Sequence, residues 1–321
     1  MEHTIKSDDM DFAAYMAQTE AQQKVRPASE FMGEITADLG QPSRDVKSFL
    51  PWEKTHRSFA FRPGEVTLWG GVNGQGKSLM SGQAMLSLMA QNERVCVASF
   101  EMKPRRTLER MVRQFSGQRP PEEWMRDAEV LATYKDVYEQ FSAYASKLLW
   151  LYDQQGTVHA DTVLGVMRYA AYELKCRHFV VDSLMKCVKG EDDYNGQKDF
   201  VDRVTALARD TGMHVHLVHH IRKLGAETDM PGKTDVKGSG SITDQVDNVL
   251  LVWRNKLKER NRQEGKLVDE SMADAMLICD KQRNGEWEGR IGLWFEPESL
   301  QYVAHQGAPA LNFCSWPHRS I

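Results

Sequence analysis

The sequence predicts an α/β fold with a mainly parallel central sheet, flanked by helices and carrying an antiparallel edge. Short apolar runs alternate with amphipathic helical patterns from about Arg62 onward, as in strands that are joined by right-handed helical crossovers. A glycine-rich stretch directly follows the first apolar run. The last apolar runs follow one another without helices between them, which indicates antiparallel pairing at one edge of the sheet.

The composition is that of a globular protein with no general excess of basic charge. The chain has 321 residues, of which 41% are hydrophobic and 27% charged, and this allows one large α/β domain or one domain with an appendage. The formal net charge is −4. Any contact with nucleic acid must therefore come from a local basic surface and not from the charge of the whole molecule.

The cysteines and the hydropathy of the chain indicate in which cellular compartment the protein is expected. The five cysteines are odd in number and are not spaced like a metal clip, so we expect reduced thiols in the core and no disulfide framework. No apolar run approaches the roughly 18 residues of a membrane span, and the acidic, polar N-terminus is unlike a secretory signal. We therefore expect a cytoplasmic protein without a membrane partner.

Three segments are predicted along the chain. Residues 1–51 are polar and carry helix breakers, with one possible helix at Phe12–Gln23, and are expected to form an arm or linker. Residues 52–305 contain the regular patterns and are expected to form the α/β domain. Residues 306–321 are expected to form a C-terminal tail.

Each element of the α/β domain is predicted from its own pattern. Strands are short apolar runs, and helices repeat apolar residues three and four positions apart. The expected strands are Glu65–Gly70, Arg94–Phe100, Leu149–Tyr152, His178–Val181, His214–His219, Asn248–Trp253, Ala275–Cys279, Arg290–Phe295 and Leu300–Val303. The expected helices are Gly76–Gln91, Pro104–Phe115, a broken helix over Pro121–Leu149, Val158–Leu174 and Gln197–Arg209. Ligands of such sheets bind at the carboxyl ends of the strands.

The glycine-rich stretch Gly71–Ser78 fits the phosphate-binding pattern G-x-x-x-x-G-K-[ST] in full, between a predicted strand and a predicted helix. Its glycines allow a tight turn whose N–H groups point at phosphate oxygens, and the helix N-terminus adds partial positive charge. Lys77 should reach the β- and γ-phosphates of ATP, and the Ser78 hydroxyl should bind Mg²⁺. The expected nucleotide-binding residues are Gly71, Val72, Asn73, Gly74, Gln75, Gly76, Lys77, Ser78 and Leu79.

Two acidic residues follow predicted strands. Asp182 ends the apolar run HFVVD, and an aspartate in this position is the expected second ligand for Mg²⁺, with a turn cap as the alternative. Glu101 ends the run RVCVASF. If that strand neighbours the strand before the phosphate-binding loop, the carboxylate of Glu101 faces the γ-phosphate and polarises the attacking water as a general base. The alternative is a solvated carboxylate at a strand end.

These motifs, together with three that follow them, resemble the motor domain of hexameric replicative helicases: the DnaB-type enzymes, the phage primase-helicases and mitochondrial Twinkle. The motifs occur in the order of the family. They are GGVNGQGKS, SFEM with a basic helix after it, FVVDS, LVHHIRK, DVKGSGSITDQVDNVLLVWRN and KQRNGEWEG. The resemblance covers about Val46 to Tyr302 and implies a RecA-like P-loop ATPase core in which Glu101 is the catalytic base.

The resemblance also assigns roles to residues later in the chain. His220 falls where the family places a Gln or His that senses the γ-phosphate, and the adjacent His219 is a competing candidate. Lys281 and Arg283 fall where the family supplies a basic pair across a subunit interface, with Arg283 as an arginine finger for the ATP of a neighbouring subunit. The alternative is a solvated hairpin at Asn284-Gly285, although such a turn would also present the finger.

Two loops with glycines and mixed charge, Lys186–Lys198 and Arg222–Gly240, are expected to follow a phosphate backbone. The resemblance implies that the second loop grips single-stranded DNA, whereas the residues alone also allow a solvated surface loop. The expected DNA-binding residues are Arg222, Lys233, Lys237, Gly238 and Gly240. The basic run Arg254–Lys266 is expected to be an exposed insertion or a solvated face.

Three functions fit these features. The first is an ATP-driven helicase that translocates on single-stranded DNA and unwinds duplex in DNA replication. The resemblance implies that such a protein forms a homo-hexameric ring in which residues 1–51 pack on the adjacent subunit. The second is a RecA-like recombination protein that binds single-stranded DNA without unwinding, and the third is a regulatory ATPase with a protein client. We expect no primase module in this chain, so a separate primase or helicase loader is the further partner, as for a motor that a phage or plasmid encodes.

Overall fold

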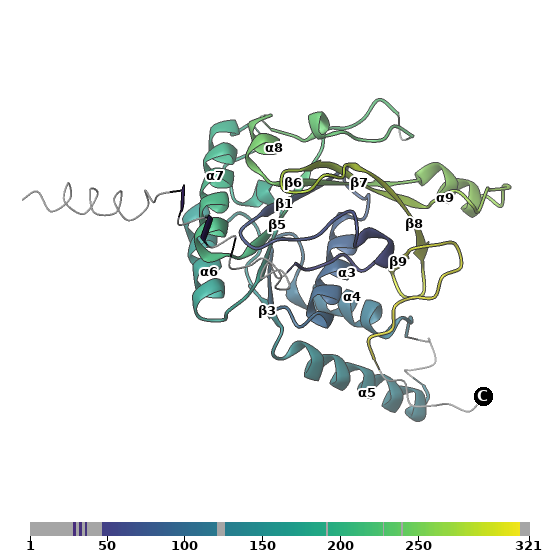
Figure 1. The fold of residues 1–321 in the computed structure, drawn as a ribbon. Helices are drawn as coiled ribbons and strands as arrows, with labels where there is room; N and C mark the ends of the chain where they lie inside the picture. The colour runs from purple at the N-terminus through teal and green to yellow at the C-terminus, as the bar shows by residue number, and fades with distance from the viewer. Residues whose placement is uncertain are drawn as a thin grey trace, which may run out of the picture. The chain divides into compact units, whose positions relative to one another are not determined.

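The computed structural model describes residues 28, 29, 32, 33, 36, 47–120, 126–190, 192–226, 228–238 and 240–314. The chain divides into two units, Met1–Val46 and Lys47–Ile321. All elements described below belong to the second unit, which is shown with its labels in Figure 1. The predicted helix Phe12–Gln23 lies outside the described residues.

The described residues form one nine-stranded sheet in the order β3-β2-β4-β5-β1-β6-β7-β8-β9. The strands are β1 (Val66–Gly71), β2 (Val95–Ser99), β3 (Leu149–Leu151), β4 (His178–Asp182), β5 (His214–His220), β6 (Asn248–Arg254), β7 (Ala275–Gln282), β8 (Gly289–Glu296) and β9 (Gln301–Val303). The pairs from β3 to β6 are parallel, and the pairs from β6 to β9 are antiparallel. The predicted fold class, with its antiparallel edge, is therefore confirmed.

Helices cover both faces of this sheet (Figure 1). The α-helices are α3 (Lys77–Ala90), α4 (Pro104–Ser116), α5 (Ala128–Ala145), α6 (Ala160–Tyr172), α7 (Tyr194–Thr211), α8 (Ser241–Gln245) and α9 (Lys256–Gln263). The described residues also form short 3-10 helices at Glu53–Thr55, Leu184–Lys186 and Lys233–Asp235. Helices α6 and α7 bury apolar side chains against one face, and α3, α4 and α5 contribute to a second core on the other. All five cysteines are buried and unpaired.

Several bounds differ from the sequence-based expectation because side chains cap the helices. Asp127 accepts hydrogen bonds from two N–H groups at the start of α5, so that this helix is shorter than the expected one. Asp193 caps α7 in the same way and shortens the expected loop Lys186–Lys198. No helix in the described part of the chain is long and apolar enough to cross a membrane.

The basic run Arg254–Lys266 is not simply a solvated face. It contains α9, whose N-cap Asn255 accepts from the Lys258 N–H. Lys258 is buried, and its ammonium lies 2.9 Å from a carboxylate oxygen of Asp274. Lys258 thus differs from the other charged residues of the run, because it is buried and its charge is paired with a carboxylate.

Candidate nucleotide-binding site

The phosphate-binding loop joins the carboxyl end of β1 to the first turn of α3. Gly74 and Gly76 have φ values of 77° and 86°, a left-handed conformation that favours glycine. A Cβ atom at Gly76 would also lie 2.5 Å from the Tyr302 hydroxyl oxygen, and one at Gly71 would lie 2.9 Å from the Val252 carbonyl oxygen. The loop therefore needs glycine for its backbone conformation and for its close packing against β6 and β9.

Lys77 is the first residue of α3, and its side chain is buried inside this loop. Its ammonium donates to the carbonyl oxygens of Gly71 (2.8 Å) and Val72 (3.2 Å). Burial lowers the pKa of Lys77 to about 8, and the nearby carboxylates of Asp182 and Glu101 act in the opposite direction. A buried cation enclosed by a loop at a helix N-terminus is the kind of environment that suits an anion such as phosphate.

Ser78 and Asp182 meet beside Lys77, although they lie far apart in the sequence. The Ser78 hydroxyl donates to Oδ2 of Asp182 at 2.9 Å. Asp182 is the last residue of β4, and burial raises the pKa of its carboxyl while the hydrogen bond from Ser78 opposes the change. A hydroxyl and a carboxylate oxygen are the ligand types that Mg²⁺ takes at nucleotide sites, so the donor set fits this ion.

Glu101 reaches the same edge of the sheet by a route that the sequence did not indicate. The expectation that its strand could neighbour the strand before the loop is wrong, because β4 and β5 lie between β2 and β1. Its Oε1 atom accepts from the Ser183 hydroxyl (2.8 Å) and lies 3.5 Å from Nε2 of His220. The hydrogen bond from His220 is the main cause that lowers the pKa of Glu101 to about 2. The carboxylate is therefore ionised at neutral pH.

The two adjacent histidines of β5 point in opposite directions, as neighbours in a strand do. His220 pairs in register with Gly71 of β1 and faces Glu101. His219 is buried, and its Nε2 donates to the Lys237 carbonyl oxygen at 2.7 Å. Burial lowers the pKa of His219 to about 4, so its imidazole is neutral at neutral pH. The structure thus brings His220, and not His219, to Glu101.

The remaining loop residues have different surroundings. Asn73 is exposed, and Leu79 is partly buried. Gln75 is buried and accepts from the Arg254 N–H through its side-chain oxygen (2.5 Å). A cavity of about 220 Å³ adjoins the loop between Val72 and the start of the segment after β5. Three residues that shape this site received no role from the sequence, because their contacts are tertiary, although the first two lie within quoted motifs: Ser183, Arg254 and Tyr302.

Lys281 and Arg283 do not reach the phosphate-binding loop of their own chain. They lie at the carboxyl end of antiparallel β7, where Gln282 pairs with Asn248 at the start of β6. About 15 Å of parallel strand separates this edge from the loop. Lys281 donates to the carbonyl oxygens of Thr243 (2.7 Å), Asp244 (2.9 Å) and Val246 (2.8 Å).

The expected DNA-binding loop leaves the carboxyl end of β5, at the same edge as the phosphate-binding loop. Its base is closed by a bridge between Ile221 and Val236. Arg222 forms an ion pair with Asp235 at 2.7 Å, and the Lys233 N–H donates to Asp280 at 2.5 Å. The later candidates are Lys237, whose N–H donates to the His220 carbonyl oxygen (3.1 Å), Gly238, with a φ of 98°, and Gly240, which precedes α8.

Comparisons with known proteins identify the family of this site. The family model described as "DnaB-like helicase C terminal domain" matches residues 56–304. A solved structure described as "ATPase Domain of G40P" is 14% identical with a TM-score of 0.67, over 87% of this chain and 99% of that chain. A second, described as "The Structure Of A DnaB-Like Replicative Helicase And Its Interactions With Primase", is 14% identical with a TM-score of 0.69, over 91% of this chain and 70% of that chain. The resemblance seen in the motifs is confirmed.

Proposed function

This chain belongs to the DnaB-like helicase C-terminal domain family, and we propose that it is an ATP-driven DNA helicase, which moves along single-stranded DNA and unwinds duplex during replication. One observation carries the proposal: the buried ammonium of Lys77, the Ser78–Asp182 pair and the Glu101–His220 pair meet at one edge of the sheet. These groups supply the parts that phosphoryl transfer to water requires.

Each part has a defined task in ATP hydrolysis. The loop amides and Lys77 bind the phosphates, and Ser78 and Asp182 hold Mg²⁺, which supplies positive charge against the phosphate oxygens. Glu101 keeps its carboxylate ionised and 39% exposed, so it is able to orient and polarise a water molecule. His220 contacts both this carboxylate and the strand that carries the loop, which suits a sensor of the γ-phosphate.

The position of Arg283 supports the proposed assembly of subunits into a ring. Because β7 places it at the far edge of the sheet from its own loop, it reaches a γ-phosphate only from a neighbouring subunit. A planar guanidinium that arrives from outside the site stabilises the charge that develops on the transferred group. We therefore propose a homo-hexamer in which each active site is completed by the next protomer.

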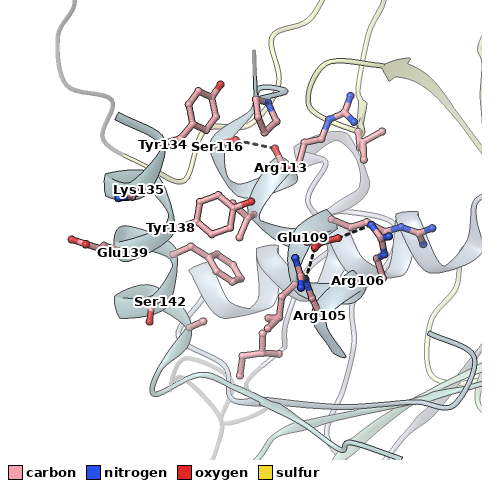
Figure 2. A pocket seen from close by; sticks show the side chains of 18 of the residues that line it. Arg105, Arg106, Glu109, Arg113, Ser116, Tyr134, Lys135, Tyr138, Glu139 and Ser142 are labelled. Atoms are coloured by element: carbon pink, nitrogen blue, oxygen red, sulfur yellow. Dashed lines mark hydrogen bonds and ion pairs between the residues drawn. The ribbon is translucent and has the colours of Figure 1, made fainter. Parts of the chain in front are cut away.

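A groove between α4 and α5 supports this assembly. It has a volume of about 1670 Å³ and is lined by Tyr134 and Tyr138 of α5 and by Arg105 and Arg113 of α4, which Figure 2 labels. The N-terminal segment carries complementary chemistry, with aspartates followed by the apolar pattern of Phe12–Gln23. We propose that this segment of a neighbouring copy occupies the groove. A Tyr138→Asp variant should then dissociate the ring in mass photometry, while the exposed control Tyr169→Asp should leave it intact.

Single-stranded DNA is proposed to contact the segment from Lys237 to Gly240. The Lys237 N–H is bonded to the His220 carbonyl oxygen, and its own carbonyl oxygen is bonded to His219. A change at the γ-phosphate sensor His220 is therefore passed to the DNA segment through one direct hydrogen bond, and through a second one that its neighbour His219 makes. Contacts of this kind are made to phosphate groups, so binding should be independent of sequence and sensitive to salt. A primase or a helicase loader would be a separate protein partner.

A strand-displacement assay on a forked duplex, with tails of both polarities, tests the proposed function. Mass photometry with and without nucleotide gives the assembly state of the same sample. Unwinding by a closed ring is the expected result. An open filament without strand displacement would favour a recombination protein, and ATP hydrolysis that DNA does not change would favour a regulatory ATPase.

A further inference from the structure

Asp247 is a buried carboxylate in the turn between α8 and β6, and it joins two functional parts of the chain. Its side chain is only 5% exposed. One oxygen, Oδ2, accepts from the N–H of Val66, the first residue of β1, at 2.9 Å. The other, Oδ1, lies 3.1 Å from Nη1 of Arg283. None of the sequence motifs had singled out this residue for a function.

Arg283 is tied to Asp247 by its backbone as well as by its side chain. The Arg283 N–H donates to the Asp247 carbonyl oxygen at 2.8 Å. The other edge of the guanidinium, Nη2, donates to the carbonyl oxygens of Asp244 (2.8 Å) and Gln245 (3.3 Å) at the end of α8. Since a guanidinium has five N–H donors, these three interactions leave two donors for a phosphate oxygen.

We propose that Asp247 is the positioning residue for Arg283, so that its carboxylate holds the guanidinium where the neighbouring subunit's phosphate-binding loop receives it. A free arginine side chain samples many rotamers, and a fixed partner removes that entropy before the subunits meet. Asp247 does not touch the nucleotide in this scheme. The inference rests on the proposed function, because it requires Arg283 to act on a neighbour's ATP.

The same carboxylate connects Arg283 to the protomer's own nucleotide site. Asp247 and Val66 exchange two hydrogen bonds, since the Asp247 N–H also donates to the Val66 carbonyl oxygen at 3.0 Å. Val66 begins β1, and β1 ends at Gly71 in the phosphate-binding loop. Asp247 thus ties the arginine of each subunit to the first residue of the strand that ends in that subunit's own loop, which gives adjacent sites a short structural link.

The test uses Asp247→Asn in the full chain. Asparagine keeps an acceptor for the Val66 N–H but removes the charge that faces Arg283. We expect kcat for ATP hydrolysis to fall roughly 10- to 100-fold, with the nucleotide Kd unchanged within about twofold. The matched control is Arg209→Gln, because Arg209 lies 3.9 Å from the same Oδ1 atom but is exposed; its kcat should equal that of the unmodified protein.

Mixing of subunits separates positioning from a merely structural role. In a mixture with Glu101→Gln protomers, a neighbour supplies a correctly held Arg283 to the intact Glu101 site of the Asp247→Asn protomer, so activity should rise above the sum of the two samples. Mixing with Arg283→Ala protomers should give no rise, because neither partner holds the arginine correctly. A defect in the fold of the Asp247→Asn protomer itself would not be relieved by any neighbour.

Three outcomes would overturn the inference. They are an unchanged kcat in Asp247→Asn, no rise with Glu101→Gln protomers, and an equal rise with Arg283→Ala protomers. If Asp247→Asn does not fold, as judged by thermal unfolding, Asp247→Glu takes its place in the same mixtures, because it displaces the carboxylate but keeps its charge. If the Arg283→Ala variant keeps full ATP turnover, the proposal that Arg283 acts on a neighbour's ATP is rejected as well. If Arg283→Ala is inactive but Asp247→Asn is fully active, only the positioning role of Asp247 is rejected.

Discussion

The imidazole of His220 lies 3.5 Å from the carboxylate of Glu101, although the strands that lead to them, β5 and β2, are separated in the sheet by β4. Ser183, which follows β4, completes the contact by donating to the same carboxylate oxygen. Three strands thus converge on one carboxylate. The pKa of Glu101, lowered to about 2 with the His220 hydrogen bond as the main cause, reflects this convergence.

Replacing Glu101 by Gln should lower kcat for ATP hydrolysis roughly 100-fold or more, because the group that polarises water is lost. Nucleotide binding should persist, since Lys77 and the loop are untouched. Steady-state hydrolysis and calorimetric titration measure the two effects. Glu264→Gln is the control, because this exposed carboxylate pairs with Lys266 just after α9. Equal activities of the two variants would remove Glu101 from the mechanism.

Gly76→Ala should destabilise the protein and weaken nucleotide binding. The new Cβ would meet the Tyr302 hydroxyl oxygen at 2.5 Å, at a residue whose φ is +86°. Gly156→Ala is a matched control with a φ of +81° and open space, so it should show only backbone strain, on the order of 1–3 kcal/mol.

The Tyr302→Phe background separates the two contributions in Gly76→Ala. Removing the hydroxyl should recover part of the free energy of unfolding that Gly76→Ala loses, because the collision is with that oxygen. Chemical denaturation of the single and double variants measures this coupling. Strictly additive effects would show that contact with Tyr302 does not limit this position.

Lys237→Ala should weaken binding of single-stranded DNA by a similar factor for all sequences. The slope of log K against log salt should fall in magnitude by about one, because one phosphate contact is removed. Fluorescence anisotropy at several salt concentrations measures the slope. Lys266→Ala, at an exposed lysine that pairs with Glu264, should leave the slope unchanged, and an unchanged slope in Lys237→Ala would speak against the DNA contact.

Stability should fall in acid because of the buried histidine His214. Its Nδ1 donates to the Arg62 carbonyl oxygen (2.7 Å), and Nε2 of the neutral ring then accepts from the Thr67 hydroxyl (2.9 Å). Burial lowers its pKa from 6.5 to about 4. Between these values the unfolded chain binds a proton that the folded chain does not, so stability declines as pH falls from 6.5 toward 4, by on the order of 3 kcal/mol.

Comparison of two variants isolates this contribution. His214→Gln retains a donor and an acceptor but does not titrate, so its free energy of unfolding should depend less on pH between 6.5 and 4. His305→Gln, at an exposed histidine, should follow the unmodified protein. Urea denaturation at several pH values checks the difference, and parallel curves for all three proteins would contradict it.

Local sequence patterns were sufficient to predict the features that depend on neighbouring residues in the chain. The loop Gly71–Ser78 was predictable because its whole pattern lies in eight consecutive positions between a strand and a helix. The fold class followed from alternating apolar runs and helical patterns. Even the placement of Asp182 near the loop followed from the rule that ligands meet the carboxyl ends of parallel strands.

The contacts of a side chain could not be predicted where they depend on the order of the strands in the sheet. Local periodicity says that a segment is a strand but not which strands flank it, so the sequence left Glu101 without its contacts to His220 and Ser183. For the same reason the burial of Lys258 within a basic run could not be predicted, because the buried ammonium is paired with Asp274, which lies outside α9.

The sequence by itself determined the phosphate-binding loop, the α/β fold class and the resemblance to replicative helicases. Each of these rests on short local patterns, which can be recognised without knowing which strands are neighbours. Only the tertiary structure decided which side chains face one another: His220 with Glu101, Ser78 with Asp182, and Arg283 with Asp247. The physical reason is that a crossover can place a strand beside one that is near in the sequence or beside one that is over a hundred residues away. The order of the strands in the sheet is then decided by how the helices pack on it.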